Sequence, residues 1–331
     1  MRSSTSASDP KAATWAIVVL LAAMTVYFVA LEVAMRTVLP RISALQRRMV
    51  QDANLAQALT PRSADGARTV LLIGNSLLAQ GVDRQELQQR LRPRYAVTYY
   101  PIEGTTYLDW LYGLRRLYAR GARPAAVVLC MSARQLLSNG TDGDVFAYWL
   151  LQTRDLPGVV QDGRLDLMTA SAYFFASKSA WLGARNGIRD NVLEKWLPRA
   201  DVLAAHLIVV DPLPTVLNQQ TQTRAIERLR RLRDVAQAHG SEFIYLVPPS
   251  LSTKDIAPGI AVPARAVGIA VLIPYRPGEV SPSKFVDGFH LNASGAIDFS
   301  DRIAPALLDV LGGADGASDR AGAGGEHSPT P

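Results

Sequence analysis

The sequence is poor in cysteine and histidine, and it lacks the motifs of several large functional classes. It contains one cysteine, Cys130, and four histidines among 331 residues. A single cysteine excludes an intramolecular disulfide and every CxxC metal or redox site. Neither GxGxxG nor GxxxxGK[ST] follows the first strand-like run, which argues against nucleotide binding. We therefore expect no cofactor and no bound metal.

Charged residues are also scarce, and they are not gathered into a nucleic-acid-binding surface. They make up 19% of the chain, whereas hydrophobic residues make up 48%, which excludes wholesale disorder. The net charge of +6 comes from basic residues spread through the sequence. The densest basic stretch, residues 224–233, places arginines between leucines at helical spacing, as on a solvated helix face. We expect no nucleic-acid partner.

One long segment near the N-terminus has no charge at all. No charged side chain occurs over residues 12–31, and at about 1.5 Å per residue a helix there can cross a bilayer core. A cleaved signal peptide is the alternative, but its apolar region usually has about 7 to 15 residues. We expect a tail of residues 1–11 and a transmembrane anchor at 12–35. Basic residues flank both ends, so they do not set the orientation.

After the anchor, short apolar runs alternate with helical patterns. Strand candidates occur at residues 69–73, 96–100, 126–129, 243–247 and 269–273. Helical patterns follow most of them, at residues 77–91, 107–118, 223–238 and 293–311. This alternation predicts an α/β domain with a parallel sheet covered on both faces.

Three other segments flank or interrupt this domain, which we expect at residues 68–311. Residues 36–67 end in the helix-breaking sequence PRSADG and are predicted to be a stalk and linker. Residues 134–215 are too long for a simple crossover and predict a helical insertion or lid over the sheet edge. Residues 312–331 are small and polar, which predicts a disordered tail.

A serine stands where the first predicted strand meets the next helix. The strand runs into Gly74-Asn75-Ser76, so Ser76 lies at the carboxyl end of a parallel strand, where α/β sheets bind ligands. The helix N-terminus adds backbone N–H groups that can stabilise an oxyanion. A serine that only caps the helix is the alternative interpretation.

A serine nucleophile needs a base, and one histidine is suitably placed. Three histidines lie in the polar tail, at a helix end before a glycine, and in the insertion: His327, His239 and His206. His290 lies in the sequence DGFHLN after the last strand, at the same sheet edge as Ser76. Asp287, three residues earlier, can orient its imidazole, although it could instead cap the final helix. We predict a Ser76–His290–Asp287 triad.

These blocks resemble those of the SGNH (GDSL-like) hydrolases. Ser76 in IGNSLL resembles the first block, Gly104 in YPIEGTT the second, and Asp287 and His290 in DGFHLN the last. The resemblance covers about residues 68–311. It implies a three-layer flavodoxin-like α/β/α fold, with Ser76 as nucleophile and the N–H groups of Ser76 and Gly104 as oxyanion donors. Without the other blocks, Gly104 is an ordinary turn glycine.

The third block departs from the family, which usually has Gly-x-Asn-Asp after the third strand. Here residues 130–135 read CMSARQ, without asparagine. Arg134 or Gln135 could fill that place, and we take Arg134 and Asn292 as candidate contacts to substrate or oxyanion. This loss, together with a single anchor, is similar to the branch that includes D-alanyl transfer proteins of teichoic acid and alginate acetylation accessory proteins.

The resemblance implies a membrane-anchored serine acyl-ester hydrolase or O-acyltransferase. Its substrate would be a cell-envelope glycan or a lipid-linked acyl donor, and a membrane-bound acyltransferase is the expected protein partner. The domain would lie on the periplasmic side of the inner membrane. The alternative is a non-catalytic SGNH-like accessory or binding module of an envelope polysaccharide modification complex, which the altered third block favours.

Overall fold

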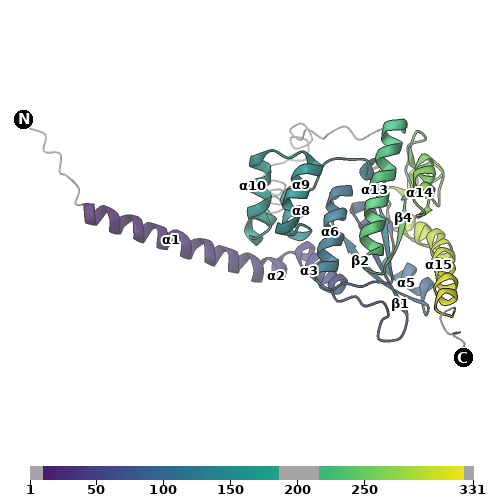
Figure 1. The fold of residues 1–331 in the computed structure, drawn as a ribbon, viewed down its shortest axis with the longest axis horizontal. Coiled ribbons are helices and arrows are strands. Elements are labelled where there is room, and N and C mark those ends of the chain that lie inside the picture. The colour runs from purple at the N-terminus through teal and green to yellow at the C-terminus, as the bar shows by residue number, and fades with distance from the viewer. Residues whose placement is uncertain (1–9, 186–215, 324–331) are drawn as a thin grey trace, which may run out of the picture.

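The computed structural model describes residues 10–185 and 216–323, in which a long N-terminal helix precedes an α/β domain (Figure 1). The sheet contains β1 (Arg68–Gly74), β2 (Tyr95–Pro101), β3 (Ala126–Cys130), β4 (Glu242–Leu246) and β5 (Ala270–Leu272). Its order is β2-β1-β3-β4-β5, and all neighbours are parallel. This is the flavodoxin-like order of doubly wound folds. The predicted fold class is confirmed.

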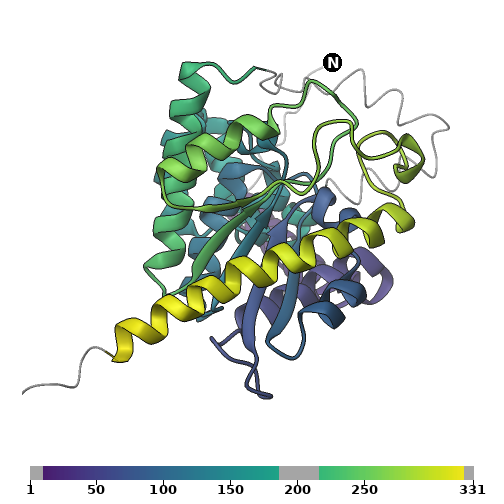
Figure 2. The ribbon, with the colours of Figure 1, turned by 90° about the vertical axis from the view of Figure 1, so that its right-hand side faces the viewer.

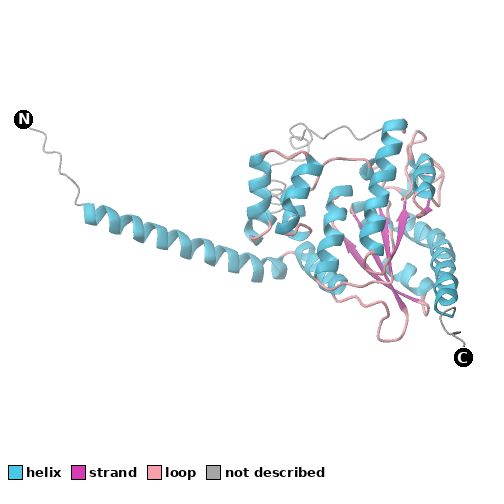
Figure 3. Cartoon of the chain, viewed as in Figure 1, coloured by secondary structure: helices cyan, strands magenta, loops and turns pink. Residues whose placement is uncertain are grey.

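Helices cover both faces of the sheet, which makes three layers (Figure 3). One face carries α3 (Ala44–Gln57), α6 (Tyr107–Ala119), α13 (Gln219–Gln237) and α14 (Ala261–Ala266). The other carries α4 (Ser76–Gly81), α5 (Arg84–Leu91) and α15 (Ala293–Ala323), and Figure 2 shows α15 crossing in front of the strands. Alternate residues of β1 serve the two faces, Leu71 and Ile73 on one and Val70 and Leu72 on the other.

Helix α3 corrects our domain boundary. We expected residues 36–67 to be a stalk, but α3 packs against β2 and contributes to the core on the α6 side. Its buried side chains are Met49, Asp52, Ala53 and Ala56. Residues 61–66 form only the turn into β1, where Arg62 bridges Arg68. The domain therefore begins near Ser43, whose side chain caps α3 by accepting from the Gln46 N–H.

The segment after β3 is helical where the structure describes it, as the sequence predicted. It contains α7 (Ala133–Leu136), α8 (Gly143–Trp149), the 3-10 turn η1 (Thr153–Asp155), α9 (Leu156–Gly163) and α10 (Leu167–Ala176). Helix α10 packs on α8, where the rings of Phe146 and Tyr173 meet edge to face at 5.8 Å. The rest of the predicted insertion, residues 186–215 with His206, lies outside the described residues.

Two helices end at places that the sequence pattern did not predict. The expected helix at residues 77–91 is two helices, because Val82 is extended and Asp83 caps α5 by accepting from the Glu86 N–H. Helix α15 continues to Ala323, whereas we expected disorder from residue 312. Residues 312–323 contain no proline, but four of the twelve are glycines, so helix propensity alone does not predict this extension of α15. Residues 324–331 lie outside the described range.

Helix α1 (Pro10–Thr37) projects away from the domain and is followed by the short α2 (Leu39–Ile42) (Figure 1). Within the described ranges, one helix, over Lys11–Ile42, is long and apolar enough to cross a membrane. Its C-terminal end is attached to the domain. Glu32 accepts hydrogen bonds from the Ser179 hydroxyl (2.8 Å) and from the N–H groups of Ala180 (2.8 Å) and Trp181 (3.3 Å).

Candidate active site

Ser76, His290 and Asp287 form a hydrogen-bonded chain at the carboxyl edge of the sheet. Ser76 begins α4 directly after β1, and its Oγ lies 2.9 Å from His290 Nε2. His290 Nδ1 lies 2.7 Å from Asp287 Oδ2. An ionised carboxylate can only accept, so the imidazole proton lies on Nδ1 and Nε2 accepts from the Ser76 hydroxyl. The structure thus brings together the three residues that we predicted.

Asp287 also shapes the loop that carries the histidine. Its Oδ1 accepts from the N–H groups of Phe289 (3.0 Å) and His290 (2.8 Å). Gly288 between them has φ +81°, a conformation that favours glycine. The hydrogen bond from the His290 imidazole, followed by those two N–H bonds, lowers the pKa of Asp287 well below its usual range. The carboxyl group is therefore ionised at neutral pH.

Asn292 caps a helix, which corrects our prediction of a substrate contact. Its Oδ1 accepts from the Ser294 hydroxyl (2.9 Å) and the Gly295 N–H (3.0 Å) at the start of α15. Its Nδ2 donates to the Ser283 carbonyl (2.7 Å). Both ends of the amide are engaged within the chain, so Asn292 holds the His290 loop against α15. Asp287 consequently does not provide this cap.

Asn75 positions the serine, a role that the sequence analysis missed. Its side chain is fully buried; Oδ1 accepts from the Leu77 N–H (3.0 Å) and Nδ2 donates to the Thr105 carbonyl (2.9 Å). The amide thereby joins the start of α4 to the loop after β2. Gly74 is also required, because a Cβ there would lie 2.2 Å from the Cys130 carbonyl oxygen. The only sequence signal for Asn75 was the preference of asparagine for helix N-caps.

Gly104 lies in the loop that Asn75 holds. Its φ is +80°, and a Cβ would lie 2.8 Å from Asp142 Oδ1, so a side chain is excluded on two grounds. The structure describes no hydrogen bond from the N–H of Ser76 or of Gly104 to any residue in 10–185 or 216–323. Both groups can therefore donate to a ligand. An oxyanion donor must have such an unused N–H group, and the assignment of these two groups to that role stays a prediction.

Two carboxyl groups support the Gly104 loop, and neither was predicted. Asp109 is fully buried and accepts from the N–H (2.6 Å) and hydroxyl (3.2 Å) of Thr106 and from the Asp142 N–H (2.9 Å). Burial raises the pKa of Asp109 to about 7. Burial and the neighbouring Asp109 raise the pKa of Asp142 to about 8. The loop thus rests on two groups that titrate near neutral pH.

A cavity of about 500 Å³ opens beside the triad. Its walls include the apolar Leu77, Ile256 and Phe289, together with Arg134 and Lys254. Arg134 lies on α7, the helix after β3, where the third block of the family would contribute its asparagine. Gln135, the other residue considered for that place, instead accepts from the N–H (3.1 Å) and hydroxyl (2.9 Å) of Ser132 at the start of α7. Arg134 therefore remains the candidate for a substrate contact.

Comparison with known proteins shows low similarity throughout. No family model matches the chain, and no curated protein matches it. Among solved structures, the chain is similar to TesA (17% identity, 72% of this chain and 98% of that chain, TM-score 0.37). It is also similar to LAE5, an alpha/beta hydrolase enzyme from the metagenome of Lake Arreo, Spain. The sequence identity is 13%, the match covers 74% of this chain and 94% of LAE5, and the TM-score is 0.38. A third similar structure is that of Est2A, an acetyl xylan esterase from the rumen bacterium Butyrivibrio proteoclasticus. The sequence identity is 11%, the match covers 74% of this chain and 64% of Est2A, and the TM-score is 0.36.

Proposed function

We propose that this chain is a serine acyl-ester enzyme of the SGNH type, held in the inner membrane by α1 with its α/β domain in the periplasm. The observation that carries the proposal is the continuous hydrogen-bonded chain from Asp287 through His290 to Ser76. The alternative that Ser76 only caps α4 does not explain why an imidazole nitrogen lies 2.9 Å from its hydroxyl oxygen. The alternative that His290 is merely solvated does not explain why a carboxylate oxygen lies 2.7 Å from its Nδ1.

In the first half-reaction Ser76 becomes acylated. Its Oγ attacks the ester carbonyl carbon while its proton passes to His290 Nε2, and Asp287 stabilises the imidazolium that forms. The carbonyl oxygen becomes an oxyanion, to which the N–H groups of Ser76 and Gly104 donate. When the intermediate collapses, the bond to the leaving alcohol breaks and that oxygen takes the proton from Nε2. The acyl group remains on Oγ.

In the second half-reaction the acyl group passes to an acceptor. His290 Nε2 removes a proton from water or from a sugar hydroxyl, whose oxygen attacks the acyl carbon. The Ser76 oxygen leaves and recovers its proton from the imidazolium. Hydrolysis and O-acyl transfer therefore use the same side chains and differ only in the acceptor. Neither route requires a cofactor or a metal.

The proposed substrate is an acyl ester of a cell-envelope glycan or of a lipid-linked donor. Membrane attachment through α1 would keep the domain beside such molecules, and a membrane-bound acyltransferase is the proposed partner. The cavity beside the triad supports this class, because its apolar wall of Leu77, Ile256 and Phe289 suits an acyl chain or sugar face. Arg134 and Lys254 on the same wall suit an acidic group next to the ester.

A fluorophosphonate probe tests this proposal against a non-catalytic accessory module. The full chain in detergent should be labelled at Ser76, and Ser76→Ala should abolish the label while leaving the thermal transition within a few degrees, since one oxygen atom is removed. Ser250→Ala, which removes a hydroxyl from the wall of the same cavity, is the matched control and should be labelled like the wild type. A folded wild-type chain that does not react would support the accessory module.

A further inference from the structure

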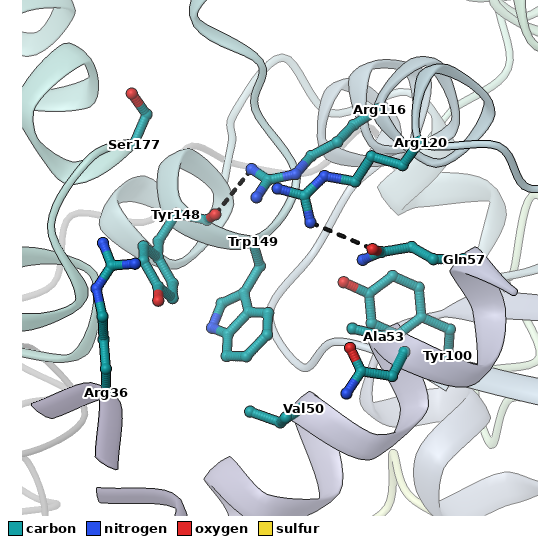
Figure 4. Close-up of a pocket in the computed structure, with 11 residues that line it drawn as sticks. Arg36, Val50, Ala53, Gln57, Tyr100, Arg116, Arg120, Tyr148, Trp149 and Ser177 are labelled. Carbon is teal, nitrogen blue, oxygen red and sulfur yellow. Dashed lines mark hydrogen bonds between the residues drawn. The ribbon is translucent and has the colours of Figure 1, made fainter.

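A second cavity, of about 220 Å³, opens where α1 meets the domain (Figure 4). It shares no lining residue with the cavity beside the triad. Its walls come from the end of α1, from α3, from β2, from α6 and from α8. Three of the lining residues are arginines, Arg36, Arg116 and Arg120, and none is acidic. Arg36 is paired with Glu32 (2.7 Å), whereas no ion pair with a described carboxylate balances Arg116 or Arg120.

The two arginines of α6 lie close together in this wall (Figure 4). Arg116 is fixed in place, because its Nη1 donates to the carbonyls of Tyr148 (2.8 Å) and Leu151 (2.7 Å). Among the described residues, the one hydrogen bond of the Arg120 side chain is to Gln57 Oε1, at 3.4 Å. Burial, and then the charge of Arg120, lowers the pKa of Arg116 to about 10. An anion between the two guanidinium groups would stabilise their charged forms, and so would oppose the lowering of this pKa.

A tyrosine hydroxyl also points into the cavity. Tyr100 is 1% exposed, and Figure 4 shows its hydroxyl directed into the space beside Trp149 and the α6 arginines. The structure gives this hydroxyl no hydrogen-bond partner among the described residues. A phenol can donate to an anion that two guanidinium groups already attract. The cavity thus presents donors from three side chains to one small space.

The cavity lies at the level of the membrane surface if α1 spans the bilayer. The uncharged run ends at Leu31, and Arg36 follows it by about 8 Å at 1.5 Å per residue. The polar headgroup region extends roughly 5 to 8 Å from each side of the hydrocarbon core. Arg36 is held there by Glu32 (2.7 Å) and by the Lys178 carbonyl (3.1 Å). The guanidinium wall therefore lies beside the lipid headgroups.

Helix α10 gives independent support for this placement. Its outer face exposes Leu167, Met168, Phe174 and Phe175, at 84%, 83%, 40% and 59%, while Tyr173 on its inner face is buried. The residues that follow α10 are those bonded to Glu32 at the end of α1. In Figure 1, α10 lies across the direction of α1. An apolar helix face in this position is typical of a helix lying in the membrane interface.

We propose that this cavity binds the phosphate group of a membrane lipid, an inference that rests on the membrane anchoring proposed above. Arg116 and Arg120 would contact the phosphate oxygens, and Tyr100 would donate a further hydrogen bond. A phosphodiester oxygen only accepts and a guanidinium only donates, so the two are complementary. Free phosphate has the same chemistry, but the position of the cavity beside the end of α1, at the level of the headgroups, favours the lipid. The ligand would fix the domain against the bilayer.

Thermal unfolding of the full chain in neutral detergent provides the test, with Ser76→Ala as the background so that catalysis plays no part. Short-chain phosphatidylglycerol should raise the unfolding temperature in a saturable way, and inorganic phosphate should do so only at much higher concentration. Arg120→Gln and Tyr100→Phe should each weaken the lipid effect about tenfold in apparent Kd. Arg115→Gln is the matched control, because Arg115 is on the same helix but faces Asp155 (3.5 Å).

Each other outcome overturns the inference. Equal stabilisation by phosphatidylglycerol of Ser76→Ala alone and of Ser76→Ala combined with Arg120→Gln or with Arg115→Gln would show that the cavity is not the site. Equal affinity for inorganic phosphate, lost in Arg120→Gln, would identify a soluble anion instead of a lipid. Because Ser76 has no role in this measurement, failure here leaves the fluorophosphonate result unaffected, and a chain without esterase activity could still bind the lipid.

Discussion

The bond between Asp287 and His290 leads to a prediction about pH. The carboxylate is already ionised near neutrality, because the imidazole and two N–H groups lower its pKa. Loss of the Asp287 proton should therefore not contribute to any rise of activity between about pH 5 and pH 9. In Asp287→Asn the imidazolium that forms during acyl transfer loses its stabilising charge, so kcat should fall by about a thousandfold or more throughout this pH range.

Turnover of a small aryl ester from about pH 5 to pH 9 measures this effect. Asp255→Asn is the control, because it removes a carboxylate from the neighbouring cavity wall without touching the imidazole. A near-normal kcat in Asp287→Asn would limit the role of this residue to its hydrogen bonds with the N–H groups of Phe289 and His290.

The catalytic role of the motif residues could be predicted from the sequence, but the residues that hold them in place could not. Ser76, Asp287 and His290 follow strand ends in local sequence blocks, so chain order alone brought them to one edge. Asn75 and Asp109 act through partners in other loops, which no local pattern reveals. Asn292 was misassigned because it belongs to the same block as His290, although an asparagine before a helix is an expected N-cap.

At the scale of elements, α3 predicts where the domain can be cut. A chain that begins at Ser43 keeps α3 and should unfold cooperatively. A chain that begins at Arg68, the boundary expected from sequence, loses the packing of Met49 and the ion pair between Asp52 and Arg84 (3.0 Å). It should be less stable by at least about 3 kcal/mol, the usual cost of removing one or two large core contacts. Urea denaturation of the two chains compares them, and equal free energies of unfolding would contradict the placement of α3.

Strands were easier to predict than helices in this chain. β1 and β3 are buried on both faces, and their sequences are continuous apolar runs, as is typical of central parallel strands. Helix α3 has a low mean hydropathy, since only one side of it is covered, and the proline after it suggested a linker. Its assignment depended on contact with β2, which is far from it in sequence.

At the scale of the whole molecule, the proposed orientation can be tested with reporters at the C-terminus. Alkaline phosphatase fused after residue 331 should be active, because that enzyme folds only outside the cytoplasm, and a green fluorescent protein fused there through the same export route should be dark. An inactive phosphatase fusion together with a fluorescent green fluorescent protein fusion would place the domain in the cytoplasm. A fusion after Gly66 should give the same answer, since α1 is the one candidate span within the described residues.

The attachment of Glu32 to Ser179, Ala180 and Trp181 has a consequence for reach. A domain on a flexible tether samples a range of heights above a bilayer, and its substrates can differ in length. Here Glu32 and Arg36 near the end of α1 are hydrogen-bonded to residues 178–181 of the domain, so under the proposed anchoring the distance from the membrane to Ser76 becomes a fixed property of the fold. The proposed function would then imply selection of esters by their height above the lipid surface as well as by their chemistry.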